Sequence, residues 1–257
     1  MDAPHAHVTI RFNRFLPYWA VLQTDLRQTL RSWVFRLWVL LVVVAAVGSI
    51  LYKVGVHREA GIVQTASVQT GDLLRALVAV SLALIALLAV SSIGTERSSV
   101  ADSVLSRGIS RHQYFLAKWH ARLVVILTTF VLMAAGVLCA HHFLFEGDLT
   151  FMGGVAAIGI IAAVLLVVVS WGVAIGALSN GTVIGITIFW LLLYGSLFVL
   201  SLLPEPFPSP ERMLTRLKFV LRGQYDADLV TQIIVASLVV SGLGAIVGLV
   251  GFSRKDV

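Results

Sequence analysis

The sequence predicts an all-α membrane protein with six transmembrane helices, on three observations. Hydrophobic residues make up 58% of the 257 residues and charged residues 12%, whereas soluble domains carry about 25% charged residues. Six apolar stretches reach the roughly 20 residues that a helix needs to cross a bilayer. None of these stretches carries Asp or Glu near its middle. The excess of apolar surface must therefore face lipid.

The six stretches belong to one continuous transmembrane domain, residues 1–257. The fourth stretch is long enough to tilt in the membrane or to break near Gly172 and Gly176. An even number of crossings places both termini on the same side. The stretches are approximately Val34–Tyr52, Leu73–Gly94, Ala121–Phe145, Phe151–Leu178, Val183–Leu203 and Leu229–Phe252.

The distribution of Lys and Arg predicts that both termini are cytoplasmic. With the termini inside, the outer segments carry seven Lys and Arg and the inner segments twelve, the asymmetry of the positive-inside rule. The net charge of +6 then needs only anionic lipid, not nucleic acid, as its partner. The twelve inner residues are Arg11, Arg14, Arg27, Arg31, Arg36, Arg97, Arg107, Arg111, Lys118, Arg122, Arg254 and Lys255.

Residues 1–33 are interpreted as a cytoplasmic tail followed by an amphipathic helix. Charged and amide residues such as Arg27 and Gln28 alternate with an apolar stripe and are too polar to enter hydrocarbon. We expect this helix to lie in the inner membrane interface, and the alternative is a helical extension of the first span. The stripe, with steps of three and four residues, is Leu16, Trp19, Leu22, Leu26, Leu30 and Trp33.

Residues 95–118 form the cytoplasmic loop with the most informative sequence features, which predict a short helix, a turn and a second helix. Val100, Val104 and Leu105 could line one side of the first helix, and Gly108 stands where a helix commonly ends. A capping box at Ser110 then starts the helix that leads into the third span.

Residues 204–228 form an outer loop of different character. Four alternating prolines, from Pro204 to Pro210, predict an extended stretch followed by a short helix that starts at Pro210. This helix would cap the bundle or rest on the outer membrane surface, and a third interpretation is that it receives an outer partner. Its apolar stripe is Met213, Leu214, Leu217, Val220 and Leu221.

The motifs of catalytic and nucleotide-binding proteins are absent from the sequence. It has no Gly-x-x-x-x-Gly-Lys-Ser/Thr phosphate loop and no Gly-x-Ser-x-Gly nucleophile elbow. We therefore expect no catalytic residues and no enzyme activity, and any ATP would be hydrolysed by another subunit.

The seven histidines lack metal-ligand spacing, so no metal site is expected in this chain. The alternative from another functional class is a haem or metal subunit, or a membrane enzyme, that uses His120, His141 and His142.

Pairs of glycines four residues apart predict close contacts between helices. Gly172 with Gly176, and Gly244 with Gly248, have the spacing that lets two helix backbones approach.

The order of these features resembles the type-2 ABC exporter permeases, most closely the branch of the nitrous-oxide-reductase maturation transporter permease. The resemblance in topology covers nearly the whole chain, and a motif covers about 25 residues of the 95–118 loop. Ser98 stands where the family usually has a second acid, and Gly108 where it has proline. The motif residues are Gly94-Thr95-Glu96-Arg97-Ser98-Ser99, Val104-Leu105-Ser106-Arg107-Gly108-Ile109-Ser110-Arg111, Tyr114, Ala117-Lys118 and the C-terminal Phe252-x-Arg254-Lys255-Asp256-Val257.

The resemblance implies that residues 95–111 are a coupling helix, which sits in a groove of a separate ATPase subunit. Two copies of that ATPase, holding ATP and Mg, would serve a homodimer of this permease in a bacterial inner membrane, and a periplasmic or extracellular accessory protein could join it. A non-transporting anchor or mechanotransmission subunit is a further alternative. The coupling residues would be Glu96, Arg97, Val100, Asp102, Val104, Leu105, Arg107, Ser110 and Arg111.

Overall fold

The computed structural model describes residues 15–60, 65–94, 109–145, 147–202 and 210–254. Every regular element in these ranges is an α-helix. Six of the described helices are long and apolar enough to cross a membrane, which confirms the all-α class and the six predicted spans. They are α2 (Trp33–Ala60), α3 (Ala66–Gly94), α5 (Arg111–Leu144), α6 (Phe151–Leu178), α7 (Thr182–Leu202) and α10 (Ala227–Arg254).

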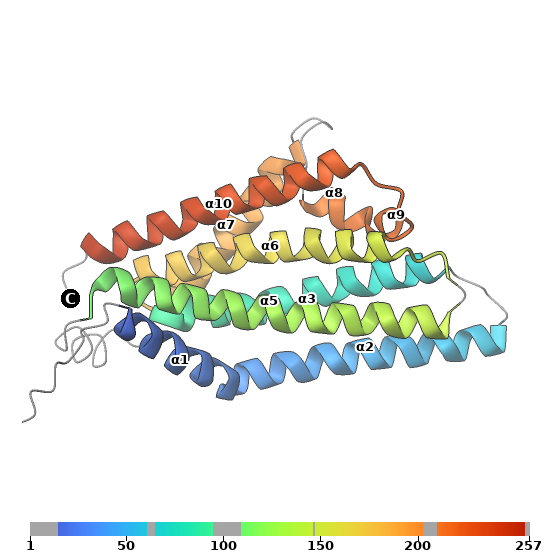
Figure 1. The fold of residues 1–257 in the computed structure, drawn as a ribbon, viewed down its shortest axis with the longest axis horizontal. Helices are drawn as coiled ribbons and strands as arrows, with labels where there is room; N and C mark the ends of the chain where they lie inside the picture. Colours follow the sequence, from blue (N-terminus) through green and yellow to red (C-terminus); the bar gives the residue numbers. More distant parts are fainter. Residues whose placement is uncertain (1–14, 61–64, 95–108, 146, 203–209, 255–257) are drawn as a thin grey trace, which may run out of the picture.

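The spans run broadly along the long axis of the molecule, with α7 inclined to it, and both described ends of the chain lie at the same end of the bundle (Figure 1). We call this end the terminal face; α1 (Leu16–Arg31) and α5 begin there, and α3 and α10 end there. The other end, the opposite face, carries α8 (Pro210–Thr215), α9 (Leu217–Leu221) and the connection between α5 and α6.

Two spans differ from their predicted beginnings. α3 begins seven residues before the expected Leu73. α5 begins at Arg111, because the helix that the capping box at Ser110 predicts continues without a break into the expected span Ala121–Phe145. The polar first turns of α3 hid its beginning, because Ser67 and Thr70 are buried inside the protein. The fourth span is one unbroken helix, so the predicted alternative of a break near Gly172 is wrong.

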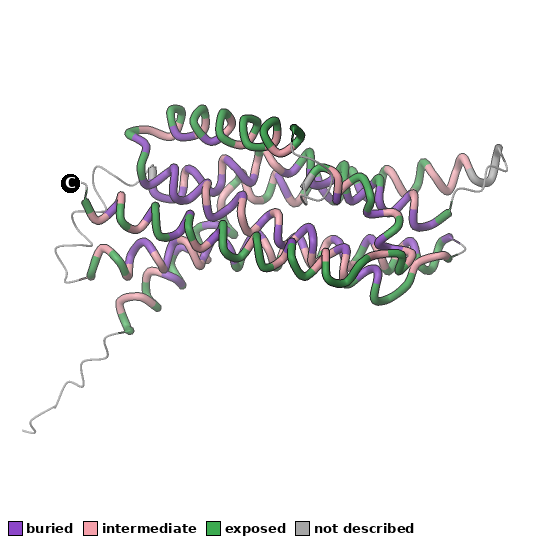
Figure 2. Tube along the Cα trace, turned by 90° about the horizontal axis from the view of Figure 1, so that it is seen from above, coloured by how far each residue is buried: buried purple, intermediate pink, exposed green. Residues whose placement is uncertain are grey.

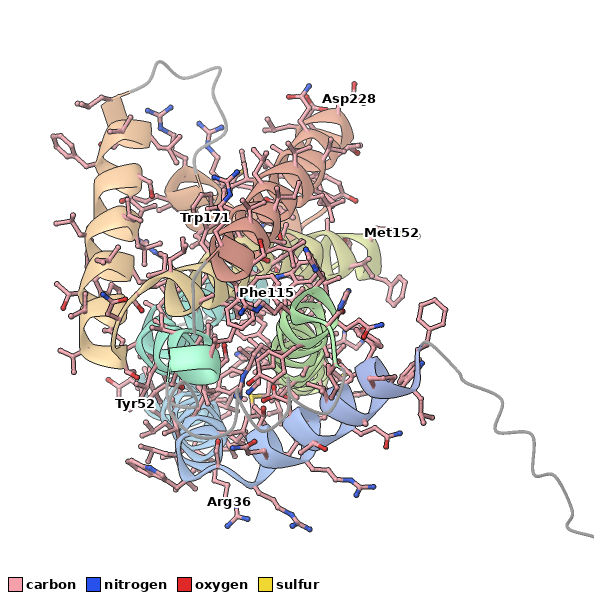
Figure 3. The ribbon with its side chains drawn as sticks, turned by 90° about the vertical axis from the view of Figure 1, so that its left-hand side faces the viewer. Arg36, Tyr52, Phe115, Met152, Trp171 and Asp228 are labelled. Carbon is pink, nitrogen blue, oxygen red and sulfur yellow. The ribbon has the colours of Figure 1, made fainter. Side chains whose placement is uncertain are left out.

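The core lies along α3, α5 and α6, and buried residues follow the inner sides of these helices while exposed residues face outward (Figure 2). Phe115 is fully buried and lies at the middle of the bundle when it is viewed from the terminal face, with Arg36 at its edge (Figure 3). The outward surface of α7 is almost wholly apolar, with Leu191, Phe198 and Leu202 exposed. Such a surface needs lipid or another apolar partner.

Buried hydroxyl and indole groups join neighbouring spans. Trp38 of α2 donates its indole N–H to Ser81 of α3 at 2.9 Å. Trp119 of α5 donates to Ser170 of α6 at 3.0 Å, and Ser170 is also hydrogen-bonded to Ser241 of α10. These bonds satisfy polar groups that hydrocarbon cannot satisfy, so they fix which faces of the helices meet.

The glycines of both predicted pairs lie at helix contacts. A Cβ at Gly176 would overlap the carbonyl oxygen of Val90 in α3, and one at Gly172 would lie 2.6 Å from the Cβ of Ala89. In α10, a Cβ at Gly248 would lie 2.9 Å from the Cα of Ala174, and Gly244 packs against the indole of Trp171. α6 therefore approaches α3 closely on one side, and on the other side the glycines of α10 leave room for the backbone of α6 at Ala174 and for the indole of Trp171.

The amphipathic helix α1 is separate from the first span. Ser32 lies between α1 and α2 with ψ of 141°, in the extended region, and the two helices form an angle in Figure 1. The alternative of one continuous helix is therefore wrong. Ser32 also starts α2, because its hydroxyl accepts a hydrogen bond from the Phe35 amide at 3.2 Å.

At the opposite face, one charge pair joins three parts of the chain. Asp148, between α5 and α6, accepts hydrogen bonds from the backbone and hydroxyl groups of Ser67 at 2.8 and 2.6 Å. Arg222, which follows α9, donates to Asp148 at 2.7 Å. The predicted outer helix is in fact two short helices, and Leu217, Val220 and Leu221 of α9 are buried against the bundle.

These contacts also set the pKa of Asp148, which lies outside the spans. Partial burial raises the pKa of this carboxyl, but hydrogen bonds from Ser67, together with the hydrogen bond and positive charge of Arg222, outweigh burial and hold the pKa below its usual value. The carboxylate is therefore the form that the folded protein stabilises.

We expect Gly176→Ala to lower the free energy of unfolding by about 1–3 kcal/mol, because the added methyl group forces α6 away from Val90. The matched control is Gly195→Ala in α7, where nothing lies within 4 Å of an added Cβ. That control should be neutral or stabilising by up to about 1 kcal/mol. Thermal unfolding in one detergent measures both, and equal melting temperatures would contradict the close approach of α3 and α6.

We expect Asp148→Asn to destabilise the protein by about 1 kcal/mol at neutral pH, a value reduced for the 29% exposure of the side chain. Because the folded-state pKa lies below the ordinary value of 3.8, the carboxylate stabilises the fold above pH 3.8, and this contribution is lost as the pH falls through the folded-state pKa. The difference in melting temperature between wild type and variant should therefore shrink below that pH. A difference that stays constant down to the lowest pH at which both fold would contradict the assignment.

Candidate functional site at the terminal face

The predicted coupling residues fall into two groups. Ser110 and Arg111 belong to the described part of the chain. The other seven lie outside the described residues: Glu96, Arg97, Val100, Asp102, Val104, Leu105 and Arg107. The structure describes what holds the two ends of this segment, which are the last turn of α3 and the first turns of α5.

The first turn of α5 is fixed by its cap and by α10. Ser110 is the N-cap, and its hydroxyl accepts a hydrogen bond from the Gln113 amide at 3.2 Å, as the capping box predicts. The guanidinium of Arg111 donates to the carbonyl oxygen of Ser253 at 3.2 Å. The second of these bonds joins the beginning of α5 to the last turn of α10.

Aromatic rings strengthen the same junction. Tyr114 stacks on Phe252 of α10 with ring centroids 6.0 Å apart, and Phe115 contacts the same ring at 6.3 Å. All three side chains are buried. The end of α10 therefore follows any displacement of the first turns of α5.

One turn further along α5, a buried ion cluster joins that helix to α1. Asp25 of α1 lies 3.3 Å from the Lys118 ammonium and 3.4 Å from the Arg122 guanidinium. Thr29, one turn after Asp25, accepts a hydrogen bond from Arg122 and donates one to the Asp25 carbonyl oxygen. The exposed fractions of Asp25, Lys118 and Arg122 are 2%, 2% and 7%.

Lys118 also reaches the other end of the 95–108 segment. Its ammonium donates to the carbonyl oxygen of Ser92 at 2.9 Å, two residues before α3 ends at Gly94. The same ammonium lies 5.3 Å from the centroid of the Tyr114 ring. One side chain of α5 thus contacts α1, the end of α3 and an aromatic ring that packs on α10.

A second contact between α1 and α5 lies beside the ion cluster. The hydroxyl of Tyr18 and the Leu116 carbonyl oxygen lie 3.1 and 2.8 Å from Nδ1 of His120. Burial raises the pKa of the Tyr18 hydroxyl above its usual value, so the phenol stays neutral and remains available as a donor.

The electrostatics of the cluster make each of its members costly to remove. Charges withdrawn from water are tolerated only when partners replace the lost hydration. Asp25 faces two cations, so its loss would take a buried counter-charge from both of them. The cluster therefore acts as a fixed joint between α1 and α5.

The three candidate histidines do not form one site. His120 and His141 are 21 residues apart on the single helix α5, which corresponds to about 30 Å along its axis. His141 is fully buried with Nδ1 at 2.9 Å from the Val137 carbonyl oxygen, while His142 is exposed. In the part of the chain that the structure describes, no three His, Cys, Asp or Glu side chains come together in a way that could hold a metal ion.

The ion cluster is the feature that sequence analysis missed. Lys118 and Arg122 count there only among the twelve inner positive charges, and Asp25 is not singled out, whereas the structure buries all three side chains. The available signal was spacing: Leu22, Asp25 and Thr29 share one face of α1, and Lys118 and Arg122 are four residues apart on α5. The expected apolar stripe of α1 is mostly turned outward, with Trp19 and Leu30 exposed.

Comparison with known proteins does not assign the chain to a family. No protein-family model matches the chain, and no curated protein shows significant similarity to it.

We expect Asp25→Ala to lower the free energy of unfolding by about 3–5 kcal/mol, because it removes the buried carboxylate that contacts both Lys118 and Arg122. The matched control is Arg27→Ala, an exposed position on the same helix, which should change stability by less than about 0.5 kcal/mol. Thermal unfolding of the two purified variants measures both changes in stability. If Asp25→Ala and the Arg27→Ala control have the same melting temperature, the cluster contributes nothing to stability.

Proposed function

We propose that this chain is the membrane-spanning permease subunit of an ATP-driven transporter, and that residues 95–118 receive a separate ATPase subunit. The observation that carries the proposal is the anchoring of the 95–108 segment. Buried contacts tie its two ends to four helices, α1, α3, α5 and α10. A force applied to this segment would therefore move a large part of the bundle.

The six spans support the same proposal. Within the described residues they provide a bundle that crosses the membrane, while the chain itself has no phosphate loop to bind a nucleotide. An energy source would have to come from another subunit. The motif in residues 94–118, which resembles the type-2 exporter permeases, supports an ATP-binding-cassette ATPase as that subunit.

The proposal includes a placement in the membrane. The terminal face is cytoplasmic, α1 lies in the inner interface, and the homodimer carries two ATPases. The exposed Leu16, Trp19 and Leu30 of α1 support the interfacial placement, because they provide an apolar surface beside a face that contains buried Asp25. Closure of the ATPases would push the coupling segment and change which side of the bundle is open.

The alternative in which the chain transmits force without moving cargo shares this ATPase contact. It would use α8 and α9 to receive an outer partner. The burial of Leu217, Val220 and Leu221 favours a structural role for α9 as a cap on the bundle. For this reason the transporter is the first choice.

The test is co-purification of the chain from its native membrane with Val104→Asp or Leu105→Asp. We expect wild type to bring an ATPase with it and each variant to lose most of it, because a carboxylate replaces part of the apolar face that would enter the ATPase groove. Ser98→Asp and Ser99→Asp are matched controls, which add the same charge elsewhere in the same segment.

Melting temperatures show whether each variant is folded. The proposal fails if folded wild type brings down no nucleotide-binding protein, or if transport persists in vesicles that contain this chain alone.

A further inference from the structure

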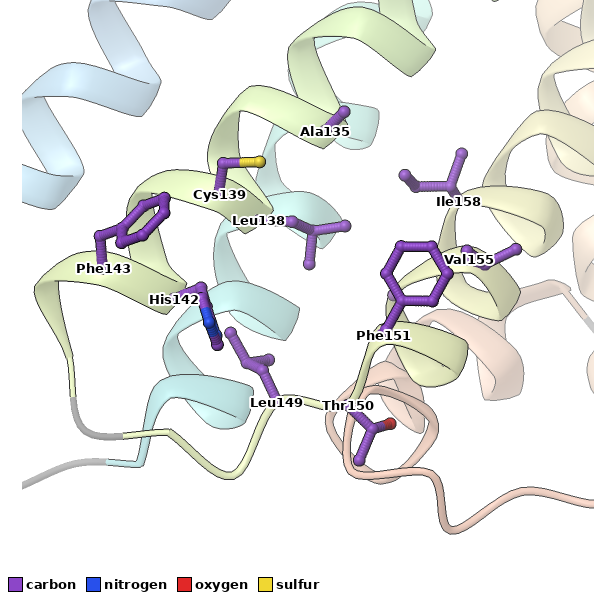
Figure 4. A pocket seen from close by; sticks show the side chains of 11 residues that line it. Ala135, Leu138, Cys139, His142, Phe143, Leu149, Thr150, Phe151, Val155 and Ile158 are labelled. Carbon is purple, nitrogen blue, oxygen red and sulfur yellow. The ribbon is translucent and has the colours of Figure 1, made fainter.

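A groove lies between α5 and α6 near the opposite face, far from the candidate coupling site (Figure 4). Its volume is about 450 Å³, within the range of roughly 300–1,000 Å³ that is typical of small-molecule sites. Leu138 and Cys139 of α5 and Phe151 and Ile158 of α6 line its two sides. We propose that this groove binds one acyl chain of a membrane phospholipid.

The groove opens onto the outer surface of the helix bundle, which would face lipid in a membrane. Both of its walls belong to helices that are long and apolar enough to cross a membrane. Phe143 and Phe151, which flank it, are 84% and 81% exposed, so the groove faces outward and not into the bundle. Its occupant therefore comes from the bilayer.

The length of the groove fits an acyl chain. The wall of α5 runs from Ala135 to Phe143, nine residues, whose eight steps of helical rise span about 12 Å. This is close to the thickness of one leaflet, about 15 Å of hydrocarbon.

The chemistry of the lining agrees with this occupant. The walls are apolar, and the floor is formed where Leu138 lies 3.3 Å from the Cβ position of Gly154. The polar residues, His142 and Thr150, lie toward the opposite face. An imidazole N–H there can donate to an ester or phosphate oxygen of the same lipid, whose chain fills the groove below.

The advantage of a bound chain over ordinary lipid is packing. Acyl chains gain no hydrophobic free energy by leaving a bilayer for an apolar groove. They gain dispersion contacts, because walls on either side touch the chain along its length. A site of this kind should retain one phospholipid when the surrounding lipids are removed by detergent.

Native mass spectrometry of the full chain, reconstituted with phosphatidylethanolamine and phosphatidylglycerol and then taken into mild detergent, tests the proposal. Wild type should retain one phospholipid per chain. Ala135→Phe, which fills the groove, should lower that occupancy at least about tenfold. Leu132→Phe is the matched control: it lies on the same helix, 68% exposed and outside the groove, and should retain the lipid. Equal occupancy in the two variants would overturn the proposal.

A second measurement uses the wild-type chain alone. Cys139 is its only cysteine and lines the groove. We expect N-ethylmaleimide to modify it at least about tenfold faster after delipidation, and added phospholipid to restore protection. A rate that delipidation leaves unchanged would overturn the proposal even if Ala135→Phe does not fold. Protection that disappears only when a co-purified protein is removed would instead assign the groove to a helix of that protein.

Discussion

One carboxylate between two cations organises the terminal face. Asp25 is the acidic partner of both Lys118 and Arg122 in the ion cluster, and all three are removed from water. Burial makes this arrangement sensitive to change, because interactions among the three charges replace the hydration that each of them has lost. α1 therefore cannot slide or roll on α5 without separating buried charges, and the end of α3 is held through the same lysine.

The remainder of the bundle is held together by other interactions. Along the spans, small residues and single hydrogen bonds replace ion pairs, as where α6 meets Val90 of α3 or where Ser170 meets Ser241 of α10. In hydrocarbon the gain from such contacts is packing and satisfied polar groups, not the expulsion of water. The bundle is thus closely packed along α3, α6 and α10, while α7 is the least buried of the described spans and exposes an apolar side.

The fold was largely predictable because bilayer thickness limits the lengths of apolar stretches. Phe151–Leu178 was predicted to the residue, since Thr150 and Ser179 interrupt hydrophobicity at its ends. The beginning of α3 was not, because buried polar groups such as Ser67 look like loop residues in a hydropathy pattern. The beginning of the α5 helix was predicted by the capping box at Ser110. The ion cluster was not predicted, because its members are far apart in the sequence. Lys118 and Arg122 lie 93 and 97 residues after Asp25, and only tertiary packing brings them together.

The proposed transmission of force requires α1 to behave as a part of the bundle. Hydrogen exchange of the α1 backbone in lipid nanodiscs tests this requirement most directly, because amide protection measures local opening. The account predicts that residues 16–31 are protected to the same degree as the first turns of α5 in wild type. In Asp25→Ala, protection of α1 should fall while that of α2 is retained. Rapid exchange of α1 in wild type, or exchange unaffected by Asp25→Ala, would contradict the joint between α1 and α5.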